Sequence, residues 1–435
     1  GSSVPLSFQG MGAMVVLVAA VLWNARQHLR QVAGAAFGWI NYQRAHKADL
    51  AAQEARADAE KLVGFLIEDF YAELEPTGRV ETMGKLAQKA VDYYDGLPPG
   101  LLTPRTRAYH GMALVRLASV AYARNDRATA DGHIQEARRL FEQLRAEGDD
   151  SESAAVGLAL ALFTPTATVG PGALGDTSAE LQRAAELLRP FATAASGSTQ
   201  AKITYADVLN HLSHEHPKET AVATCEEARQ ILAGVGAKDL SNLTAASVYA
   251  DTADSQARHS MALGRLEDAA RLEQEVYDLT ERVLAQRPGD LRSMRNRALA
   301  ADLLGVLADR RHDYATALEF ARKAERAGED YVRFNPSDMV AWNYWVRGKE
   351  QIGSVLFEQG RMTEAQAMFR SAVALDQDPR RPASLGVLMP QTWRMVAANE
   401  ARLGRRAAAL AALEASERAH QEQVAMLPES SARRE

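Results

Sequence analysis

The chain has 435 residues, of which 47% are hydrophobic, and a formal net charge of −6. This acidic balance argues against a nucleic-acid-binding protein, which would be expected to carry a basic face, and the single cysteine, Cys225, excludes an intrachain disulfide framework. No alternation of apolar and polar residues persists long enough to indicate a β-strand, so we predict an all-α fold.

The N-terminal stretch is the most apolar part of the sequence. Residues 11–23 are nearly all hydrophobic, and with residues 6–10 the stretch reaches 18 residues, close to the ~20 that a membrane-spanning helix needs. Trp23 closes it, and Arg26 and Arg30 follow, as at a membrane interface. We predict a transmembrane helix and hence a single-pass membrane protein. A helix packed in the protein core and a signal peptide are the alternatives.

The sequence leaves open on which side of the membrane the rest of the chain lies. Arg26, Arg30, Arg44 and Lys47 follow the span, which favours a cytoplasmic C-terminal part. The chain starts with Gly1 rather than methionine, so we expect a further domain before it. A large cytoplasmic domain there would place the C-terminal part outside instead.

Residues 1–43 are thus predicted to form a transmembrane and juxtamembrane segment. The Ala-rich, charged residues that follow indicate a helical stalk. Pro76 and Gly78 end a helix whose return partner is predicted over 80–94, because both residues interrupt helical structure. We assign residues 44–100 to the stalk and to a hairpin that caps the rest of the chain.

A recurring helix–turn–helix pattern covers most of the remaining sequence. In its clearest copy, residues 353–372, a tight turn at Gly360 separates two helical segments. Gly353 and Ala365 are small where the two helix backbones approach, and Phe369 is predicted to fill the space between them. Similar turns centre on positions 125, 216, 264, 312 and 404, and three equal steps of 48 residues separate positions 216, 264, 312 and 360.

This unit resembles the tetratricopeptide (TPR) repeat, a helical hairpin of about 34 residues. The resemblance implies an α-solenoid of about seven hairpins over residues 101–427, followed by a polar tail, 428–435. The 48-residue step exceeds the TPR period by roughly 14 residues, or about four helical turns. We therefore expect each helix to be about two turns longer than usual.

The long period, together with the block at 60–79, resembles the TPR arrays that follow the membrane span in bacterial membrane-anchored kinases and related signalling effectors. The resemblance implies a protein-interaction or sensing module that binds a protein or peptide in the solenoid groove. The alternative is a self-assembly scaffold that forms a homo-oligomer and so gathers an N-terminal effector domain.

Residues 164–177 interrupt the repeat pattern with two prolines and three glycines. They are predicted to form a loop between one helix at 153–163 and another at 178–191. Such a loop projects from one edge of a solenoid, either as a functional element or as a tolerated insertion.

No catalytic motif is recognisable in the sequence. It contains no Gly-rich phosphate loop, no nucleophile elbow and no HExxH zinc helix, so we predict no enzymatic activity and no cofactor. His211, His214 and His216 have metal-like content, but we interpret them as a polar helix end and predict no metal site. Cys225 takes the position that Phe369 holds in its repeat, which favours a packing role over a reactive thiol.

The inner faces of the first helices of the hairpins are the predicted partner-binding surface. The helical phase read from Gly305 and Gly353, and from the equivalent alanines, places eight charged residues there: Asp251, Asp254, Arg258, Arg295, Asp302, Arg347, Glu350 and Arg394. Their mixed signs indicate a polar protein or peptide partner. The alternative is an ordinary solvated face.

Overall fold

The structure is a computed structural model that describes residues 15–21, 23, 59–67, 79–169 and 177–426. Within these ranges it is all-α, as predicted, with no β-strand. Helix α4 (Val80–Asp95) is followed by seven helical hairpins: α5 (Pro104–Ala123) with α6 (Arg127–Ala146), α7 (Glu152–Val169) with α8 (Ser178–Ala192), α9 (Thr199–Ser213) with α10 (Lys218–Gly234), α11 (Leu243–Ala262) with α12 (Leu266–Gln286), α13 (Leu291–Arg310) with α14 (Tyr314–Phe334), α15 (Met339–Glu358) with α16 (Met362–Ala374), and α17 (Met389–Arg402) with α18 (Arg406–Met426).

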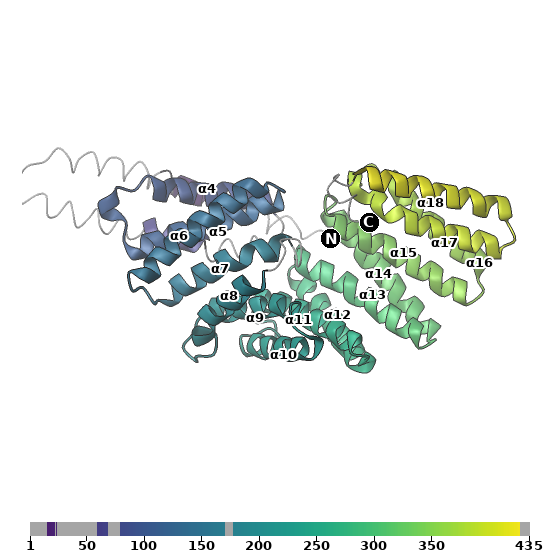
Figure 1. Ribbon diagram of the computed structural model, residues 1–435, viewed down its shortest axis with the longest axis horizontal. Helices are drawn as coiled ribbons and strands as arrows, with labels where there is room; N and C mark the ends of the chain where they lie inside the picture. The colour runs from purple at the N-terminus through teal and green to yellow at the C-terminus, as the bar shows by residue number, and fades with distance from the viewer. Residues whose placement is uncertain (1–14, 22, 24–58, 68–78, 170–176, 427–435) are drawn as a thin grey trace, which may run out of the picture.

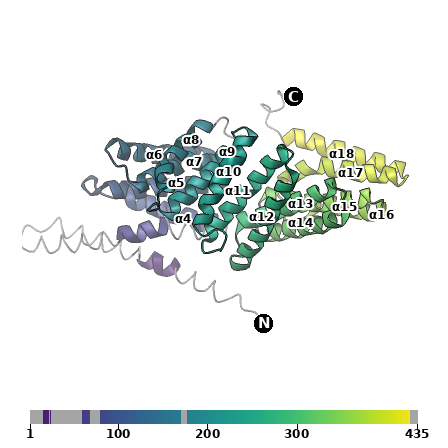
Figure 2. The same cartoon turned by 90° about the horizontal axis from the view of Figure 1, so that it is seen from below.

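The hairpins stack side by side along a curved path, so that α4 and α18 lie at opposite ends of an arc (Figure 1, Figure 2). Each first helix contacts the first helix of the next hairpin, without a break from α5 to α17. The first helices therefore line the inner side of the curve, where neighbouring hairpins come closest. This arrangement is a helical solenoid.

The turns within the hairpins carry the backbone conformation that their sequence predicts. Gly264, Gly360 and Gly404 have φ values of +75°, +75° and +73°, and His312 has +58°. Glycine adopts this left-handed conformation without steric strain, which explains its place in three of the turns. His216 does not share the conformation, because Pro217 follows it and restricts the backbone of the preceding residue.

The helices are long, as the 48-residue step predicts. Helices α11 to α15 contain 20 or 21 residues each. Side chains at the first positions stabilise several of them, as at α13, where Asp290 Oδ1 accepts a 2.8 Å hydrogen bond from the backbone N–H of Ser293.

Two glycines allow a close crossing between α14 and α15. A Cβ added to Gly328 would stand 2.5 Å from the backbone nitrogen of Trp345, and one added to Gly348 would stand 2.5 Å from the backbone nitrogen of Glu325. The two backbones thus meet where neither residue has a side chain. Trp342 lies fully buried in the core of the same region.

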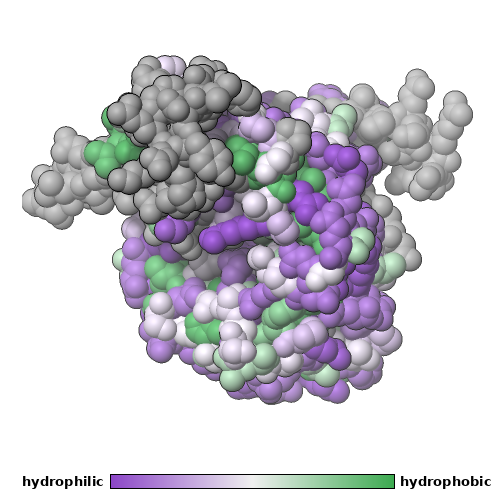
Figure 3. Space-filling view, turned by 90° about the vertical axis from the view of Figure 1, so that its left-hand side faces the viewer, coloured by the Kyte–Doolittle hydropathy of each residue, from purple (hydrophilic) through white to green (hydrophobic). Residues whose placement is uncertain are grey.

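Polar residues dominate the described surface at one end of the solenoid, and the main apolar clusters lie inside. Figure 3 shows the α4–α8 end of the molecule, where the described surface is largely hydrophilic and hydrophobic residues form small, separate groups. The main apolar cluster lies inside and runs continuously from Val63 to Leu307, while smaller clusters hold the C-terminal hairpins together.

The prediction of an N-terminal transmembrane helix is wrong for the residues that the structure describes. In that part of the chain no helix is long and apolar enough to cross a membrane. Of the predicted span, residues 15–21 and 23 are described, and the rest lies outside the described residues. Val18 packs instead against a cluster formed by Leu66, Met83 and Val120.

The single-pass membrane location built on that helix is therefore also wrong. Much of the predicted juxtamembrane segment and stalk, residues 24–58, lies outside the described residues, as does the polar tail from residue 427. The predicted domain boundaries stay a prediction.

The predicted loop at 164–177 begins later than expected, because α7 continues through Pro165 to Val169. A proline lacks the N–H that would bond the carbonyl four residues earlier, which here belongs to Ala161. Arg138 of α6 replaces that donor, with its Nε 3.2 Å from the Ala161 oxygen. A tertiary hydrogen bond thus compensates the local helix breaker. Residues 170–176 lie outside the described residues.

Candidate partner-binding cleft

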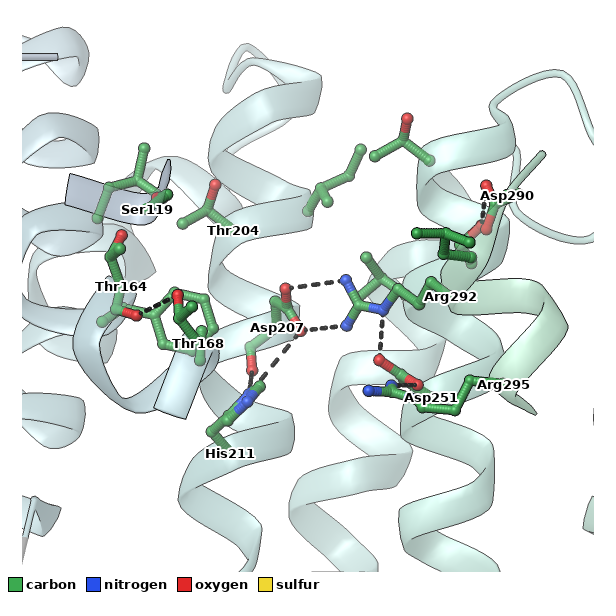
Figure 4. Close-up of a pocket in the computed structure, with 18 of the residues that line it drawn as sticks. Ser119, Thr164, Thr168, Thr204, Asp207, His211, Asp251, Asp290, Arg292 and Arg295 are labelled. Carbon is green, nitrogen blue, oxygen red and sulfur yellow. Dashed lines mark hydrogen bonds and ion pairs between the residues drawn. The ribbon is translucent and has the colours of Figure 1, made fainter. Parts of the chain in front are cut away.

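A cleft of about 540 Å³ opens on the inner side of the solenoid. Residues from α5, α7, α9, α11 and α13 line it, so it crosses the first helices of five successive hairpins. Hydroxyl, carboxylate, imidazole and guanidinium groups point into it (Figure 4): Ser119, Thr164, Thr168, Thr204, Asp207, His211, Asp251, Asp290, Arg292 and Arg295.

Arg292 of α13 joins three hairpins at the floor of the cleft (Figure 4). Its Nη2 and Nη1 donate to the two carboxylate oxygens of Asp207, over 2.7 and 3.3 Å. Its Nε donates to Asp251, whose other oxygen accepts a 2.6 Å hydrogen bond from Arg295 Nη2. Two carboxylates and two guanidinium groups therefore form one alternating chain, in which each charge faces its opposite.

The chain of charges sets the protonation state of Asp251. Burial opposes ionisation of this carboxyl, which is only 11% exposed. The charges of Arg292 and Arg295 outweigh burial, so the pKa of Asp251 is held below its usual value. The same carboxylates raise the pKa of Arg292. Asp251 and Arg292 are therefore both charged at neutral pH.

A similar connection recurs along the inner face beyond the cleft. Arg347 of α15 donates from Nη2 to Asp302 of α13 over 2.5 Å, and Thr392 of α17 donates to Glu350 of α15 over 2.7 Å. Like the bond between Asp251 and Arg295, each of these contacts joins the first helices of adjacent hairpins. Together they form a ladder that ties the inner side of the curve.

The structure thus places seven of the eight predicted partner-binding residues in contacts within the chain. Asp251 with Arg295 and Asp302 with Arg347 pair between hairpins, and Asp254 with Arg258 pairs within α11 over 2.8 Å. Glu350 accepts from Thr392, and Arg394 is exposed. As contacts to a partner, these eight residues stay a prediction.

Asp207 and Arg292 are the central pair that the sequence reasoning missed. They lie 85 positions apart, so they belong to hairpins that are not neighbours in the chain. A usable signal does exist for the shorter links: Asp251 with Arg295 and Asp302 with Arg347 are separated by 44 and 45 positions. Oppositely charged residues whose separation is about one helical turn shorter than the 48-residue step therefore indicate side chains that meet between adjacent repeats.

A buried acidic pair lies beneath this ladder. Glu273 of α12 is fully buried, and neither of its carboxyl oxygens has a hydrogen-bond partner among the described residues. Burial, and next the negative charge of Asp254, raise the pKa of Glu273 well above its usual value. Burial also raises the pKa of Asp254, although Arg258 opposes the shift. Burial therefore disfavours the ionised form of both carboxyl groups, and the charge of Asp254 adds to this effect at Glu273.

The three histidines near the end of α9 contact different partners. His211 Nδ1 lies 3.0 Å from the Asp207 carbonyl oxygen, His214 Nε2 lies 3.4 Å from Ser255 Oγ, and His216 Nδ1 lies 3.3 Å from Thr224 Oγ1. Within the described ranges, no group of three His, Cys, Asp or Glu side chains has the arrangement of a metal site.

Cys225 is fully buried, as its predicted packing role requires. Burial raises the pKa of its thiol to about 11, so the reactive thiolate is disfavoured at neutral pH.

No protein-family model and no curated protein sequence matches the chain. Among solved structures, it is similar to a signal transduction ATPase with numerous domains (STAND) from Pyrococcus horikoshii that has a tetratricopeptide repeat sensor. The identity is 13%, the TM-score is 0.56, and the match covers 94% of this chain and 53% of that one. The chain thus spans about half the length of that protein.

Weaker similarities are found to BtubC from P. vanneervenii and to the human IFIT1 dimer with PPP-AAAA. The first has 17% identity and a TM-score of 0.43 and covers 58% of this chain and 92% of that one. The second has 14% identity and a TM-score of 0.38 and covers 85% and 87%. The similarity to the STAND protein establishes the fold and nothing beyond it. The chain is a TPR-like helical solenoid, as the repeat pattern predicts.

Proposed function

We propose that the chain is a non-catalytic protein-interaction module that holds an extended segment of a protein partner along its inner cleft. We further propose that it serves as the sensing or docking part of a larger signalling protein. The observation that carries the proposal is the cleft itself, which crosses the first helices of five successive hairpins.

The dimensions of the cleft suit a polypeptide. Packed helices lie about 8–10 Å apart, so five of them in a row span roughly 32–40 Å. An extended chain advances about 3.3–3.6 Å per residue, so about ten residues of a partner would cross the cleft. The hydroxyl groups of Ser119 and Thr168 donate to carbonyl oxygens of their own helices and offer acceptors for its backbone. The hydroxyl group of Thr204, which accepts from Gln200, offers a donor. The TPR sensor of the similar signal transduction ATPase supports the sensing role.

The proposal is tested by selecting peptides on the purified chain and mapping where they bind. A photo-crosslinking residue at Thr168, which is exposed and lines the cleft, should capture the selected peptides. The same photo-crosslinking residue placed at Arg271 should not capture them, because Arg271 is 67% exposed on α12 and does not line the cleft. Gln200→Trp, which adds bulk to the cleft wall, should weaken binding. Crosslinking at Arg271 alone, or unchanged binding by the tryptophan variant, would refute this function.

Self-assembly is a second candidate function, and one observation favours it. Helix α18 leaves Leu410, Leu413 and Val424 about half exposed, at spacings that place them on one helix face. Light scattering over a range of protein concentrations separates the two candidates. A monomer favours partner capture. An oligomer favours the scaffold if it dissociates in the double variant that combines Leu410→Glu with Leu413→Glu.

A further inference from the structure

The inner face between α11 and α15 exposes its arginines and buries their carboxylate partners. The side chains of Arg258, Arg295 and Arg347 are 50%, 42% and 46% exposed. The carboxylates that they contact, on Asp254, Asp251 and Asp302, are 8%, 11% and 3% exposed. The three arginines equal the three carboxylates in number. Because the arginines are the more exposed groups, a ligand meets the cationic side chains first.

Each of these three arginines keeps donors available for a ligand. Each of the carboxylate contacts described above is made by a single nitrogen, Nη2. Arg295 also donates from Nε to Asn296 Oδ1 over 3.5 Å, which leaves its Nη1 donors available. A guanidinium carries five N–H donors in a planar fork and binds carboxylates best through two of them. The remaining edge of each fork is a suitable carboxylate site.

Tyr344 of α15 lies within reach of the charges of two of these arginines and on the same helix face as the third. The charges of Arg258 and Arg295 both act on the Tyr344 phenol, as do those of Asp254 and Asp302. Arg347 lies three positions further along the same helix and therefore on the same face. Burial, and next the charge of Asp254, raise the pKa of Tyr344 to about 12, so the phenol keeps its proton as a hydrogen-bond donor.

The buried acids under this surface repel an anion less than their number suggests. Burial raises the pKa of Asp302 as well as those of Asp254 and Glu273, so it disfavours negative charge at all three positions. Salt does not screen the exposed guanidinium groups strongly over the few ångströms at which a bound carboxylate would lie, since the Debye length is about 8 Å at physiological ionic strength.

We propose that this surface, formed by Arg258, Arg295, Arg347 and Tyr344, binds an acidic segment of a protein partner through its carboxylate groups. The inference rests on the proposed function and names the chemical class of its partner. The acidic segment would lie across the first helices of three successive hairpins, from α11 to α15, and would continue into the adjoining cleft at Arg295, which belongs to both.

The test measures fluorescence anisotropy of a labelled oligoglutamate peptide with the full chain. Oligoglutamine and oligolysine peptides of the same length serve as ligand controls. We expect binding of the oligoglutamate alone, weakened when the NaCl concentration rises from about 0.05 to about 0.5 M. Equal binding of the oligoglutamine or oligolysine peptide would overturn the inference.

The variants must avoid leaving a buried carboxylate without its partner, because that alone can unfold a domain. We therefore pair the changes: Arg347→Gln with Asp302→Asn, and Arg258→Gln with Asp254→Asn. Each double variant should weaken oligoglutamate binding roughly tenfold, the range expected for one lost charge-assisted hydrogen bond. Circular dichroism and the thermal midpoint confirm that the variants fold. Unchanged affinity in both folded variants would overturn the inference.

Arg405→Gln is the matched control. Arg405 is 59% exposed and pairs with the buried Glu400, which Arg370 also contacts, so its removal leaves that carboxylate paired. It lies beyond the end of α17, away from Tyr344, and its loss should leave oligoglutamate binding unchanged. A fall equal to that of the double variants would show that an exposed arginine outside this surface matters as much to the peptide, and it would overturn the assignment to this surface.

Two further outcomes separate this inference from the proposed function. If selected peptides crosslink at Thr168 but are neutral, the interaction module stands and the acidic partner is wrong. If oligoglutamate binds and depends on Arg347 while no peptide crosslinks at Thr168, the arginine surface stands as a site for acidic segments and the cleft is not where partners lie. Tighter binding of a single-stranded oligonucleotide than of oligoglutamate would assign the surface to phosphate groups and refute an acidic protein partner.

Discussion

Gly353 of α15 lies directly against the ring of Phe369 of α16. A Cβ added to Gly353 would stand 2.5 Å from Phe369 Cε1, closer than any side chain tolerates. Phe369 is 3% exposed, and Ala365 and Ala372 beside it are fully buried. One large ring surrounded by small residues therefore closes this hairpin, which is the packing that the sequence of the repeat predicts.

Replacing that ring should damage the solenoid locally. Phe369→Ala empties an aromatic core site and should lower the free energy of unfolding by about 3–5 kcal/mol. Because the hairpins of a solenoid pack mainly against their neighbours, hydrogen exchange should accelerate from about residue 338 onward and stay slow before residue 287. Phe334→Ala is the control, since Phe334 is 48% exposed and should lose about 1 kcal/mol or less. Faster exchange along the whole chain would contradict the solenoid.

The hairpins could be predicted from the sequence because their determinants are local. A left-handed residue at Gly264 or Gly360 and small residues at fixed distances from it define a helical hairpin without knowledge of its neighbours. Predictions failed where a distant partner decides the outcome. Pro165 reads as a helix breaker until Arg138, in another helix, is known to satisfy the carbonyl that it leaves free.

The candidate site could be predicted only in part for the same reason. Helical phase indicated that Asp251 and Arg295 face inward, and both line the cleft. Their pairing, and the link of Arg292 to Asp207, depend on how neighbouring hairpins are rotated relative to one another. That rotation arises from packing along the whole inner side and leaves no mark within a single repeat.

The charge chain at the cleft floor should contribute to stability. Asp251→Asn removes the carboxylate that lies between Arg292 and Arg295. The two neighbouring guanidinium groups then lose the negative charge that they share. We expect the free energy of unfolding, measured in urea, to fall by about 3–5 kcal/mol. Asp268→Asn, in an exposed pair with Arg271, should lower it by less than about 1 kcal/mol. A loss at Asp251 as small as that at Asp268 would mean that water already screens the cleft floor.

The buried Glu273 should make the protein less stable as pH rises. Its pKa is raised in the folded state, so above its unfolded pKa, about 4.5, the unfolded chain releases a proton that the folded chain retains. Stability is therefore fully present below that value and falls as pH increases toward the folded pKa.

Glu273→Gln removes this titration while keeping the size of the side chain. The variant should be more stable than the parent chain at pH 7–8, and its stability should depend less on pH. Glu267→Gln is the control on the same helix, because Glu267 is 86% exposed, and it should change stability by less than about 0.5 kcal/mol. A glutamine variant at position 273 that is less stable than the parent at pH 7–8 would show that the carboxylate form is the one stabilised.

The buried His259 should have the opposite effect in acid. It is 3% exposed, its Nε2 lies 3.1 Å from Ser213 Oγ, and burial lowers its pKa to about 4. Its stabilising contribution is present above the unfolded pKa of about 6.5, and it is lost as pH falls, because the unfolded chain then binds a proton that the folded chain excludes. The ring of His214, whose pKa is also lowered to about 4, lies 5.3 Å away, and the two positive charges would repel each other once formed.

Between pH 6.5 and 5, His259 alone should account for a loss of about 2 kcal/mol, since each pH unit in this window corresponds to roughly 1.4 kcal/mol. In His259→Gln the midpoint of urea unfolding should therefore change less over this window than in the parent chain. His420→Gln, at an exposed position of α18, should retain the parent's pH dependence. If the slope survives in His259→Gln and disappears in His420→Gln, the acid sensitivity does not arise at the joint between α9 and α11.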